Sequence, residues 1–241
     1  MSLKKIFKKR KKLKAAASIK RLDVRTEEVD GLDIGTRKII NLLNYTKRSA
    51  SAYDGEGYDV GYHSFNIGGR KFKGQRDPTQ RFANVEYDFT GKTLLDVGCN
   101  QGGMIHEVAD QIKHGVGIDY DSRMINVANR IRSYNNSQNV DFFVFNLEEE
   151  PLDMITDLLP EGKVDIAFLL SVCMWFNNWK DVVKFVYDHS DALLFESNGK
   201  VEQQDEQIAY LNELYSRVDL LAATSEDDPR QKRRKLLICH K

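Results

Sequence analysis

The chain has 241 residues, and its 36 Lys+Arg balance 36 Asp+Glu, so the formal net charge is zero. This length accommodates one α/β domain with a full hydrophobic core and an N-terminal extension. The three cysteines, Cys99, Cys173 and Cys239, are odd in number and widely spaced, which argues against a disulfide framework or a zinc site and favours a reducing compartment. No apolar run approaches the roughly 18 residues of a membrane span, and the charged N-terminus lacks the apolar core of a secretory signal, so we expect a cytoplasmic protein.

Charge is unevenly distributed along the chain. Residues 1–25 form a basic arm with eleven Lys/Arg and one acid, whereas residues 141–165 contain eight Asp/Glu and one lysine. Within the arm, residues 1–20 have the pattern of a basic helix with a thin apolar stripe. Such an arm suits an anionic membrane surface, which would place the protein peripherally at the inner membrane surface, or it suits RNA. A solvated tail is the alternative.

Residues 26–85 are expected to combine a helix with an irregular cover. Arg37–Arg48 has apolar residues at helical spacing and predicts a short amphipathic helix. Residues 49–80 contain Gly, Tyr, Ser and Arg with little periodicity, and an irregular stretch of this length is usually functional or disordered. Its aromatic residues and arginines argue against disorder, so we expect this segment to cover a ligand site.

Residues 86–241 alternate between strand and helix patterns. Strands are predicted at 93–98, 115–119, 140–146, 164–170 and 191–196, and helices at 103–113, 121–135, 151–159, 179–189 and 201–216. Two final strands, Val218–Ala223 and Leu236–His240, flank a predicted turn at Asp227–Lys232. The alternation predicts an α/β fold with a Rossmann-like, doubly wound and mostly parallel sheet, closed by a C-terminal antiparallel β-hairpin.

The most informative stretch is Thr93–Gly103, in which an apolar strand reaches Asp96 and is followed by a Gly-rich turn. The turn reads Asp96-x-Gly98-x-x-x-Gly102 rather than G-x-G-x-x-G. The dinucleotide fingerprint needs its middle glycine so that the backbone can approach a pyrophosphate, and Asn100 occupies that place. The turn therefore disfavours a nicotinamide dinucleotide and fits a phosphate-free nucleoside such as S-adenosylmethionine.

Other residues at strand ends suit the same cofactor. Asp119 ends the next strand 21 positions after Gly98, close to the spacing of about 20 residues at which an acid binds ribose hydroxyls. An acid at a strand end can instead serve only as a helix cap. Asp96 is placed to meet the cofactor's ammonium group, and the loop up to Gly102 lets the backbone pass close to the methionine part. The next two strands end near the expected adenine and methyl positions, at Asn146, Leu147, Leu170 and Ser171.

Three segments carry a family resemblance: Asp96–Asn100, Gly117–Ile125 and Leu169–Trp175. Through them residues 91–241 resemble the class I S-adenosylmethionine-dependent methyltransferases. Within that class the chain resembles the methylphosphate capping enzymes, which methylate the 5′ γ-phosphate of small RNAs, and also methyltransferases found with bacterial surface-polysaccharide assembly. The resemblance implies that Arg81 holds the cofactor's carboxylate and that S-adenosylhomocysteine is the product. It further implies cofactor contacts at Gly98, Cys99, Asn100, Asp119, Tyr120, Asn146, Leu147 and Leu170.

The remaining chemistry depends on the acceptor. Methyl transfer from a sulfonium is an in-line displacement, for which the enzyme mainly supplies alignment. A phosphate oxygen needs cations to place it, whereas a hydroxyl needs a general base, and an aromatic side chain can stack on a base or sugar. The candidates are Arg70, Lys71, Lys73 and Arg76 for the cations, His63 and Glu196 for the base, and Trp175 for stacking. Each of these residues could instead have a structural role, the charged ones and the histidine on the surface and the tryptophan in packing.

The sequence thus predicts an S-adenosylmethionine-dependent O-methyltransferase without a metal site. Its acceptor is expected to be a phosphate or hydroxyl on a glycan, a lipid-linked intermediate or another metabolite. Methylation of RNA, at a 5′-phosphate or a nucleotide, is the alternative acceptor. A catalytically silent regulatory module that binds S-adenosylmethionine is the alternative of another class.

Overall fold

The computed structural model of the chain describes residues 22–25, 31–46, 59–225 and 233–241. The predicted basic helix of residues 1–20, the start of the predicted cover and the predicted turn at Asp227–Lys232 lie outside these residues. Within the described residues, no helix combines the length and the apolar character needed to cross a membrane.

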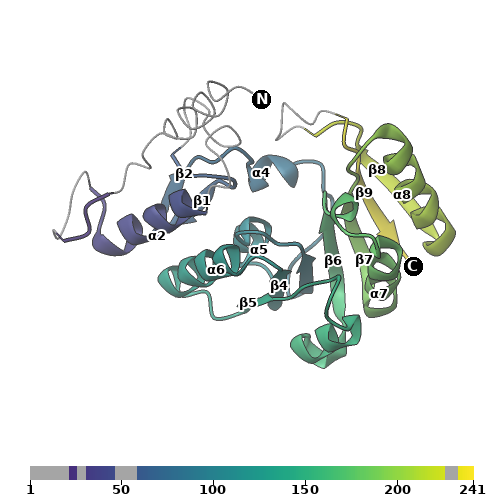
Figure 1. Cartoon of the computed structure of the whole chain (residues 1–241), viewed down its shortest axis with the longest axis horizontal. Helices are drawn as coiled ribbons and strands as arrows, with labels where there is room; N and C mark the ends of the chain where they lie inside the picture. Colours follow the sequence, from purple (N-terminus) through teal and green to yellow (C-terminus); the bar gives the residue numbers. More distant parts are fainter. Residues whose placement is uncertain (1–21, 26–30, 47–58, 226–232) are drawn as a thin grey trace, which may run out of the picture.

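A seven-stranded sheet forms the centre of the molecule, in the order β5-β4-β3-β6-β7-β9-β8 (Figure 1). Its five parallel strands are β3 (Thr93–Val97), β4 (His114–Asp119), β5 (Val140–Val144), β6 (Val164–Leu170) and β7 (Ser190–Glu196). The last two strands, β8 (Arg217–Ala222) and β9 (Leu236–His240), are antiparallel, with β9 paired to β7 and β8 at the edge. The Rossmann-like sheet and its C-terminal antiparallel hairpin are therefore confirmed.

The strand order reverses at β3, which lies between β4 and β6. The chain first builds β4 and β5 on one side of β3 and then crosses over to build β6 and β7 on the other. In open α/β sheets, ligands bind outside the carboxyl ends of the strands at such a reversal. Asp96 pairs in register with Gly117 on one side and Phe168 on the other, which places it beside this point.

Helices cover both faces of the sheet. They are α5 (Gly103–Val108), α6 (Ser122–Asn135), α7 (Trp179–His189) and α8 (Val201–Leu214), with short 3₁₀ turns η1 (Leu152–Leu158), η2 (Pro160–Gly162) and η3 (Cys173–Trp175). Because side chains alternate along a strand, Leu94 packs with α5 and α6, whereas Leu95 packs in the layer that contains α7 and α8. Two separate apolar cores therefore hold the strand ends in place.

Two predicted helices differ from the observed ones. α5 ends at Val108 rather than at residue 113, because the Gln111 N–H donates to the Val108 carbonyl (2.9 Å) and the chain turns to bury Ile112. The predicted helix at 151–159 is the 3₁₀ segment η1, which lies between Pro151 and Pro160. Proline interrupts the α-helical hydrogen-bond pattern, so this short segment does not grow into a regular helix.

The N-terminal segment is more regular than predicted. The amphipathic helix is confirmed as α2 (Ile34–Tyr45), and it begins earlier than expected because the Asp33 side chain accepts a hydrogen bond from the Thr36 N–H (2.7 Å). The prediction of irregular structure was wrong for much of residues 59–80, which form the hairpin β1 (Phe65–Ile67) and β2 (Arg70–Phe72) and the short helix α4 (Pro78–Arg81). The hairpin turn uses Gly68 and Gly69, both with positive φ, a signal that hydrophobic periodicity does not register.

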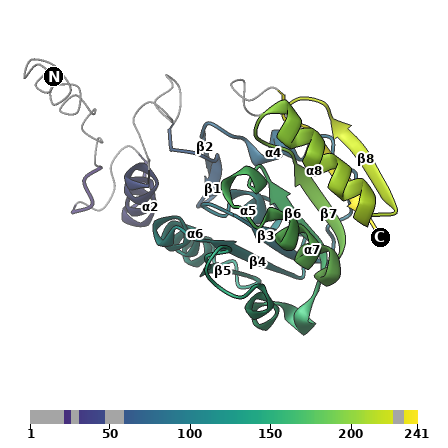
Figure 2. The ribbon, with the colours of Figure 1, turned by 45° about the vertical axis from the view of Figure 1, so that its right-hand side comes forward.

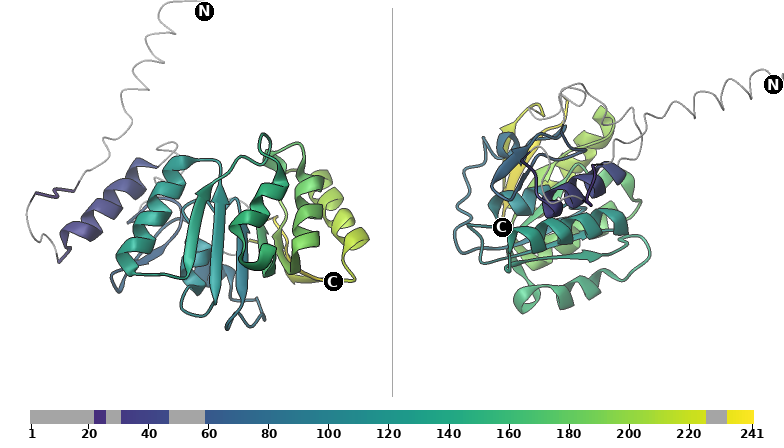
Figure 3. Two further views of the ribbon diagram at one scale, coloured as in Figure 1. Left: turned by 90° about the horizontal axis from the view of Figure 1, so that it is seen from below. Right: turned by 90° about the vertical axis from the view of Figure 1, so that its left-hand side faces the viewer.

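α2 and the hairpin pack together on α6, as Figure 2 shows for the two helices. Their shared apolar cluster includes Ile39 and Leu43 of α2, Phe65 of the hairpin, and Val127 and Ile131 of α6. This N-terminal layer lies at the opposite end of the molecule from the C-terminus (Figure 3). From it the chain passes toward the carboxyl ends of the parallel strands.

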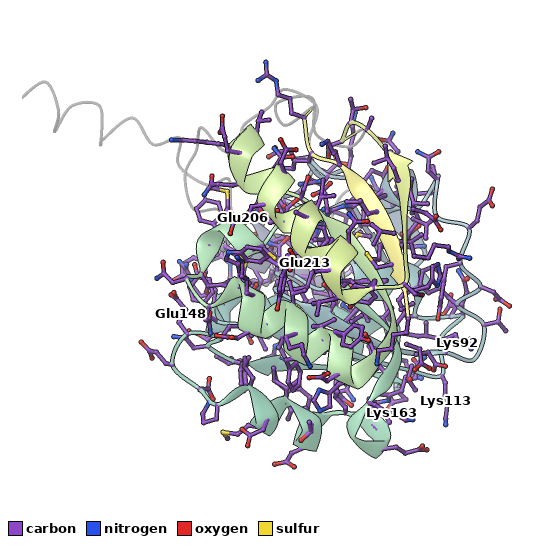
Figure 4. The ribbon with its side chains drawn as sticks, turned by 90° about the vertical axis from the view of Figure 1, so that its right-hand side faces the viewer. Lys92, Lys113, Glu148, Lys163, Glu206 and Glu213 are labelled. Atoms are coloured by element: carbon purple, nitrogen blue, oxygen red, sulfur yellow. The ribbon has the colours of Figure 1, made fainter. Side chains whose placement is uncertain are left out.

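Lysines gather at the amino-terminal edge of the parallel sheet. Lys92, Lys113 and Lys163 each precede a strand, and they lie together on one side of the view in Figure 4. Glu148, which follows β5, lies on the other side of that view. The amino-terminal edge is therefore lysine-rich, and the polar residues considered below come from the carboxyl edge.

Candidate functional site

A cavity of about 470 Å³ opens at the carboxyl ends of β3, β4, β5 and β6. β3 and its loop contribute Asp96, Gly98, Cys99 and Asn100 to its wall, and β4 contributes Asp119 and Tyr120. The wall continues with Asn146 and Leu147 after β5, Leu170 and Ser171 at the end of β6, and Arg81 from α4. The structure thus brings together every predicted cofactor residue except Gly102.

The loop after β3 is folded back onto the end of β4. The N–H groups of Gly98 and Cys99 both donate to the Ile118 carbonyl, at 2.8 and 3.0 Å. Gly98 has φ +76°, and a Cβ there would lie 2.5 Å from Val172, so the turn needs glycine at this position. Asn100 also has positive φ, a conformation that asparagine tolerates better than most residues.

Gly102 contributes to packing rather than to the wall of the cavity. It has φ +73° and directly precedes α5, and a Cβ there would lie 2.5 Å from the Phe142 ring. Gly102 was expected to lie close to the ligand. It instead lets the loop after β3 pack against Phe142 of β5.

Asp119 is held by two backbone groups. Its Oδ2 accepts from the Asn100 N–H and its Oδ1 from the Asp121 N–H, both at 2.9 Å. The helix cap of α6 is Asp121, which accepts from the Arg123 N–H (3.0 Å). Asp119 therefore does not cap that helix, and its carboxylate at the cavity wall is the type of acceptor that ribose hydroxyls need.

Asp96 is a buried carboxyl group at the cavity wall, only 2% exposed. Burial raises the pKa of Asp96 to about 7, and the nearby Asp119 adds to the shift while Arg81 opposes it. A buried acid of this kind is stabilised in its charged form by a cation, because the cation offsets the lost hydration. The ammonium group of S-adenosylmethionine fits this requirement.

The loop after β5 is fixed by its own hydrogen bonds. Glu150 Oε1 accepts from the Asn146 N–H (2.6 Å), and Asn146 Oδ1 accepts from the Glu148 N–H (3.1 Å). The Leu147 carbonyl accepts from the Asn178 side chain (2.6 Å). These bonds hold Asn146 and Leu147 at the cavity wall. An adenine ring needs a polar group at its edge and an apolar side chain against its face, and these two residues fit that need.

Glu196, a predicted base, lies in a buried network instead of at the cavity wall. It forms ion pairs with Arg81 and with Arg76, whose Nη2 is 3.2 Å from Glu196 Oε1. Arg76 was predicted to help place a phosphate acceptor, but it is only 1% exposed and is paired with Glu196. Sequence reasoning missed this pairing because the two partners are 120 positions apart.

The other predicted substrate cations also lie outside the cavity wall. Arg70 and Lys71 are exposed on β2, where Lys71 pairs with Asp77 (3.0 Å) and the Arg70 guanidinium lies over the Phe72 ring. Lys73 follows β2 and is exposed as well. Trp175, in contrast, lines the cavity and is 71% exposed, so it forms part of the lip.

His63 lines the cavity and is 3% exposed. Its ring packs against Tyr62, with ring centroids 4.5 Å apart, and against the start of α5. A Cβ on Gly103 would lie 2.4 Å from His63 Nδ1, so this glycine admits the imidazole. The His63 backbone is anchored by a bridge to Arg76.

Further wall residues were not predicted from the sequence. Phe145 and Val172 adjoin predicted residues, so a broader reading of the strand ends would have found them. Tyr62 likewise adjoins the predicted His63, whereas Met104 lies within α5 and carries no such signal. The unpredicted residues include Tyr62, Met104, Phe145, Glu148, Val172 and Phe176.

Residues 95–191 match a family model described as a methyltransferase domain. The chain contains a methyltransferase domain. This domain is of the S-adenosylmethionine-dependent class I type, and the acids and loop described above fit that cofactor. The search of curated proteins found no match to the chain.

Solved structures share the fold of this methyltransferase domain. WbdD, described as a bifunctional kinase-methyltransferase, is 21% identical with a TM-score of 0.56 over 70% of this chain and 41% of its own. The chain therefore spans about two fifths of the length of WbdD. The N-terminal domain of EvdMO1, solved with S-adenosylhomocysteine and D-fucose, is 12% identical with a TM-score of 0.57 over 77% of this chain and 91% of that domain.

Proposed function

We propose that this chain is an O-methyltransferase that acts on a hydroxyl group of a glycan or a lipid-linked glycan, with His63 as the general base. The observation that carries the proposal is the position of the imidazole. His63 is the one histidine among the described residues that line the cavity, and it lies at the same cavity as Leu170 and Ser171. A hydroxyl acceptor must lose a proton near neutral pH, and imidazole is the side chain best suited to accept it.

A hydroxyl acceptor has better support than a phosphate. A phosphate needs a group of cations to place it. Among the described wall residues, Arg81 is the one Lys or Arg, and it is already paired with Glu196. The exposed cations Arg70 and Lys71 lie on the hairpin, outside the cavity wall.

His63 is also a better base than Glu196. The Glu196 carboxylate is engaged by Arg76, Arg81 and Ser225, and it does not line the cavity. Protonating it would break these buried ion pairs, which is costly. Glu196 therefore suits a positioning role.

Aromatic side chains at the lip support a sugar acceptor. Tyr62, Trp175 and Phe176 line the cavity, and the flat faces of such rings pack well against the apolar faces of sugars. The fold is shared with the EvdMO1 domain that was solved with D-fucose. The basic arm of residues 1–25 would place the enzyme at an anionic membrane surface, where lipid-linked glycans are found.

The residues of the chain divide the work of this reaction. S-adenosylmethionine, when bound, supplies the methyl group on its sulfonium. Asp119 binds the ribose hydroxyls, and Asp96 binds the ammonium group. The walls around Leu170 exclude water, and an imidazole nitrogen of His63 takes the acceptor's proton as the acceptor oxygen bonds to the methyl carbon and displaces S-adenosylhomocysteine from it.

The test supplies the full chain with methyl-labelled S-adenosylmethionine and fractionated cell extract. We expect label in a lipid or glycan fraction that resists nuclease and yields a methyl ether of a sugar. His63→Gln should lower kcat by about 10²–10⁴-fold and leave S-adenosylhomocysteine affinity unchanged. His114→Gln, at the amino-terminal edge of the sheet, is the matched control. Label in RNA or in a phosphate ester would contradict the proposal, as would full activity of His63→Gln, and binding without any transfer would identify a regulatory module.

A further inference from the structure

Glu196 lies at the centre of a buried charge network that joins three parts of the chain. Its carboxylate forms ion pairs with Arg81 of α4 and with Arg76, which precedes α4. From the C-terminal hairpin, Ser225 Oγ donates to Glu196 Oε1 (3.1 Å), and Arg234 Nη1 lies 3.8 Å from Oε2. One acid therefore connects the cover, α4 and the segment between β8 and β9.

Guanidinium groups surround the Glu196 carboxylate. Three guanidinium groups, those of Arg76, Arg81 and Arg234, meet the single carboxylate of Glu196. Buried charge is unfavourable unless it is paired. A guanidinium that reaches the cavity wall, as that of Arg81 does, would therefore stabilise an anion supplied by a ligand.

Arg81 is the member of the network that reaches the cavity wall. Its Nη2 donates to Glu196, while its Nε is buried and has no hydrogen-bond partner among the described residues. A guanidinium is planar and its five N–H groups point in fixed directions. The bond from Nη2 to Glu196 therefore also determines where the other donors of Arg81 point.

Asp96 lines the same cavity as Arg81, and it indicates which kind of anion Arg81 could bind. Asp96 is close enough to Arg81 for the guanidinium to influence its ionisation. In an amino acid, the ammonium and the carboxylate are attached to one carbon, so their binding groups must be neighbours. Asp96 and Arg81 are such a pair, one acidic and one basic.

We infer that Glu196 is a positioning residue, which orients Arg81 to bind the carboxylate of the cofactor's methionine moiety while Asp96 binds the ammonium group. Arg76 and Ser225 hold Glu196 in the required position. The C-terminal hairpin thereby contributes to the cofactor site, although none of the described residues from Arg217 to the C-terminus lines the cavity. The inference concerns the methyl donor and is independent of which acceptor is used.

The test compares two ligands that differ at the methionine moiety. S-adenosylhomocysteine carries the carboxylate and ammonium, whereas 5′-methylthioadenosine has the same adenosine and thioether sulfur without them. Calorimetry of the full chain should show that Glu196→Gln weakens S-adenosylhomocysteine about 10- to 100-fold and changes 5′-methylthioadenosine by less than about 2-fold. Arg81→Gln should show the same selectivity. Glu206→Gln, which removes an exposed partner of Lys180, is the matched control and should change neither affinity.

Two further measurements separate positioning from general damage. Ser225→Ala removes one hydrogen bond to Glu196 and leaves the ion pairs intact, so it should fold and weaken S-adenosylhomocysteine alone, by about 3-fold. This variant provides the test if Glu196→Gln does not fold. Equal weakening of both ligands, or unchanged S-adenosylhomocysteine affinity, overturns the inference. Failure of the proposed acceptor chemistry would appear separately, as intact ligand binding without methylation of a hydroxyl.

Discussion

The backbone N–H of Asn100 donates a hydrogen bond to the Asp119 carboxylate, 2.9 Å away, and so ties the loop after β3 to the end of β4. The two strands are parallel neighbours, so this bond closes the gap where their loops diverge. It fixes the carboxylate at the cavity wall. The loop and the ribose-binding acid therefore act as one unit.

Replacing the Asp119 carboxylate should weaken cofactor binding. Asp119→Ala removes both the acceptor for ribose hydroxyls and the anchor of the Asn100 N–H. Losing hydrogen bonds to a charged group costs about 1.5–3 kcal/mol, so we expect the dissociation constant of S-adenosylhomocysteine to rise about 10- to 100-fold. Calorimetry measures this directly. Asp181→Ala, on the exposed side of α7, is the control, and equal affinity of the two variants would contradict the assignment.

The buried acid Asp96 should make stability depend on pH. Burial raises its pKa from 3.8 to about 7, with Asp119 adding to the shift and Arg81 opposing it. The folded chain therefore binds this proton more tightly than the unfolded chain. Its contribution to stability is fully present below about pH 4 and is lost as pH rises through about 7. The total change is at most about 4 kcal/mol.

Asp96→Asn isolates this contribution, because the amide stays neutral while the other titrating groups are retained. Urea unfolding of both proteins from pH 4 to pH 8 gives the difference in unfolding free energy. We expect that difference to move steadily in favour of Asp96→Asn as pH rises. A difference that does not change with pH would show that Asp96 is not the titrating group.

The residues at the strand ends were accessible from the sequence because two local rules determine them. A strand pattern places its last residue at the carboxyl edge of a parallel sheet, and the strand order brings those edges together. Asp96, Asp119, Asn146 and Ser171 follow from these rules. For Asn100 the sequence indicated only that a glycine was missing, and the structure adds that this asparagine keeps a positive φ.

Other features depend on contacts that no local pattern contains. The pairing of Arg76 with Glu196 spans 120 positions and joins a cover segment to the end of β7. The sequence therefore suggested that Arg76 binds the acceptor and that Glu196 is the general base. The hairpin at residues 65–72 was missed for a different reason, because its strands of three residues are too short to show an alternating pattern.

Ser171 should tolerate replacement by glycine with a gain in stability. It has φ +62°, and its buried Oγ has no hydrogen-bond partner among the described residues. Glycine adopts this backbone conformation without strain, so Ser171→Gly should raise the unfolding free energy by about 1 kcal/mol. Glu161→Gly, at an exposed position with φ +58°, is a matched comparison. Urea unfolding measures both, and a loss of stability in Ser171→Gly would show that its hydroxyl is held by the fold.

The two tryptophans of the chain should separate acceptor binding from stability. Trp175 is 71% exposed at the cavity lip, whereas Trp179 packs edge-on against Tyr210 between α7 and α8, with ring centroids 5.6 Å apart. Trp175→Ala should raise the acceptor KM about 10-fold, since it removes the apolar ring face against which a sugar packs. It should change the unfolding free energy by less than about 0.5 kcal/mol.

Trp179→Ala should show the reverse pattern. It removes packing between α7 and α8, so the unfolding free energy should fall by about 1–3 kcal/mol while the acceptor KM stays unchanged. Steady-state kinetics with the labelled acceptor fraction and urea unfolding of the same preparations measure both quantities. If Trp175→Ala destabilises the fold and leaves KM unchanged, Trp175 is a packing residue and the acceptor does not bind at this lip.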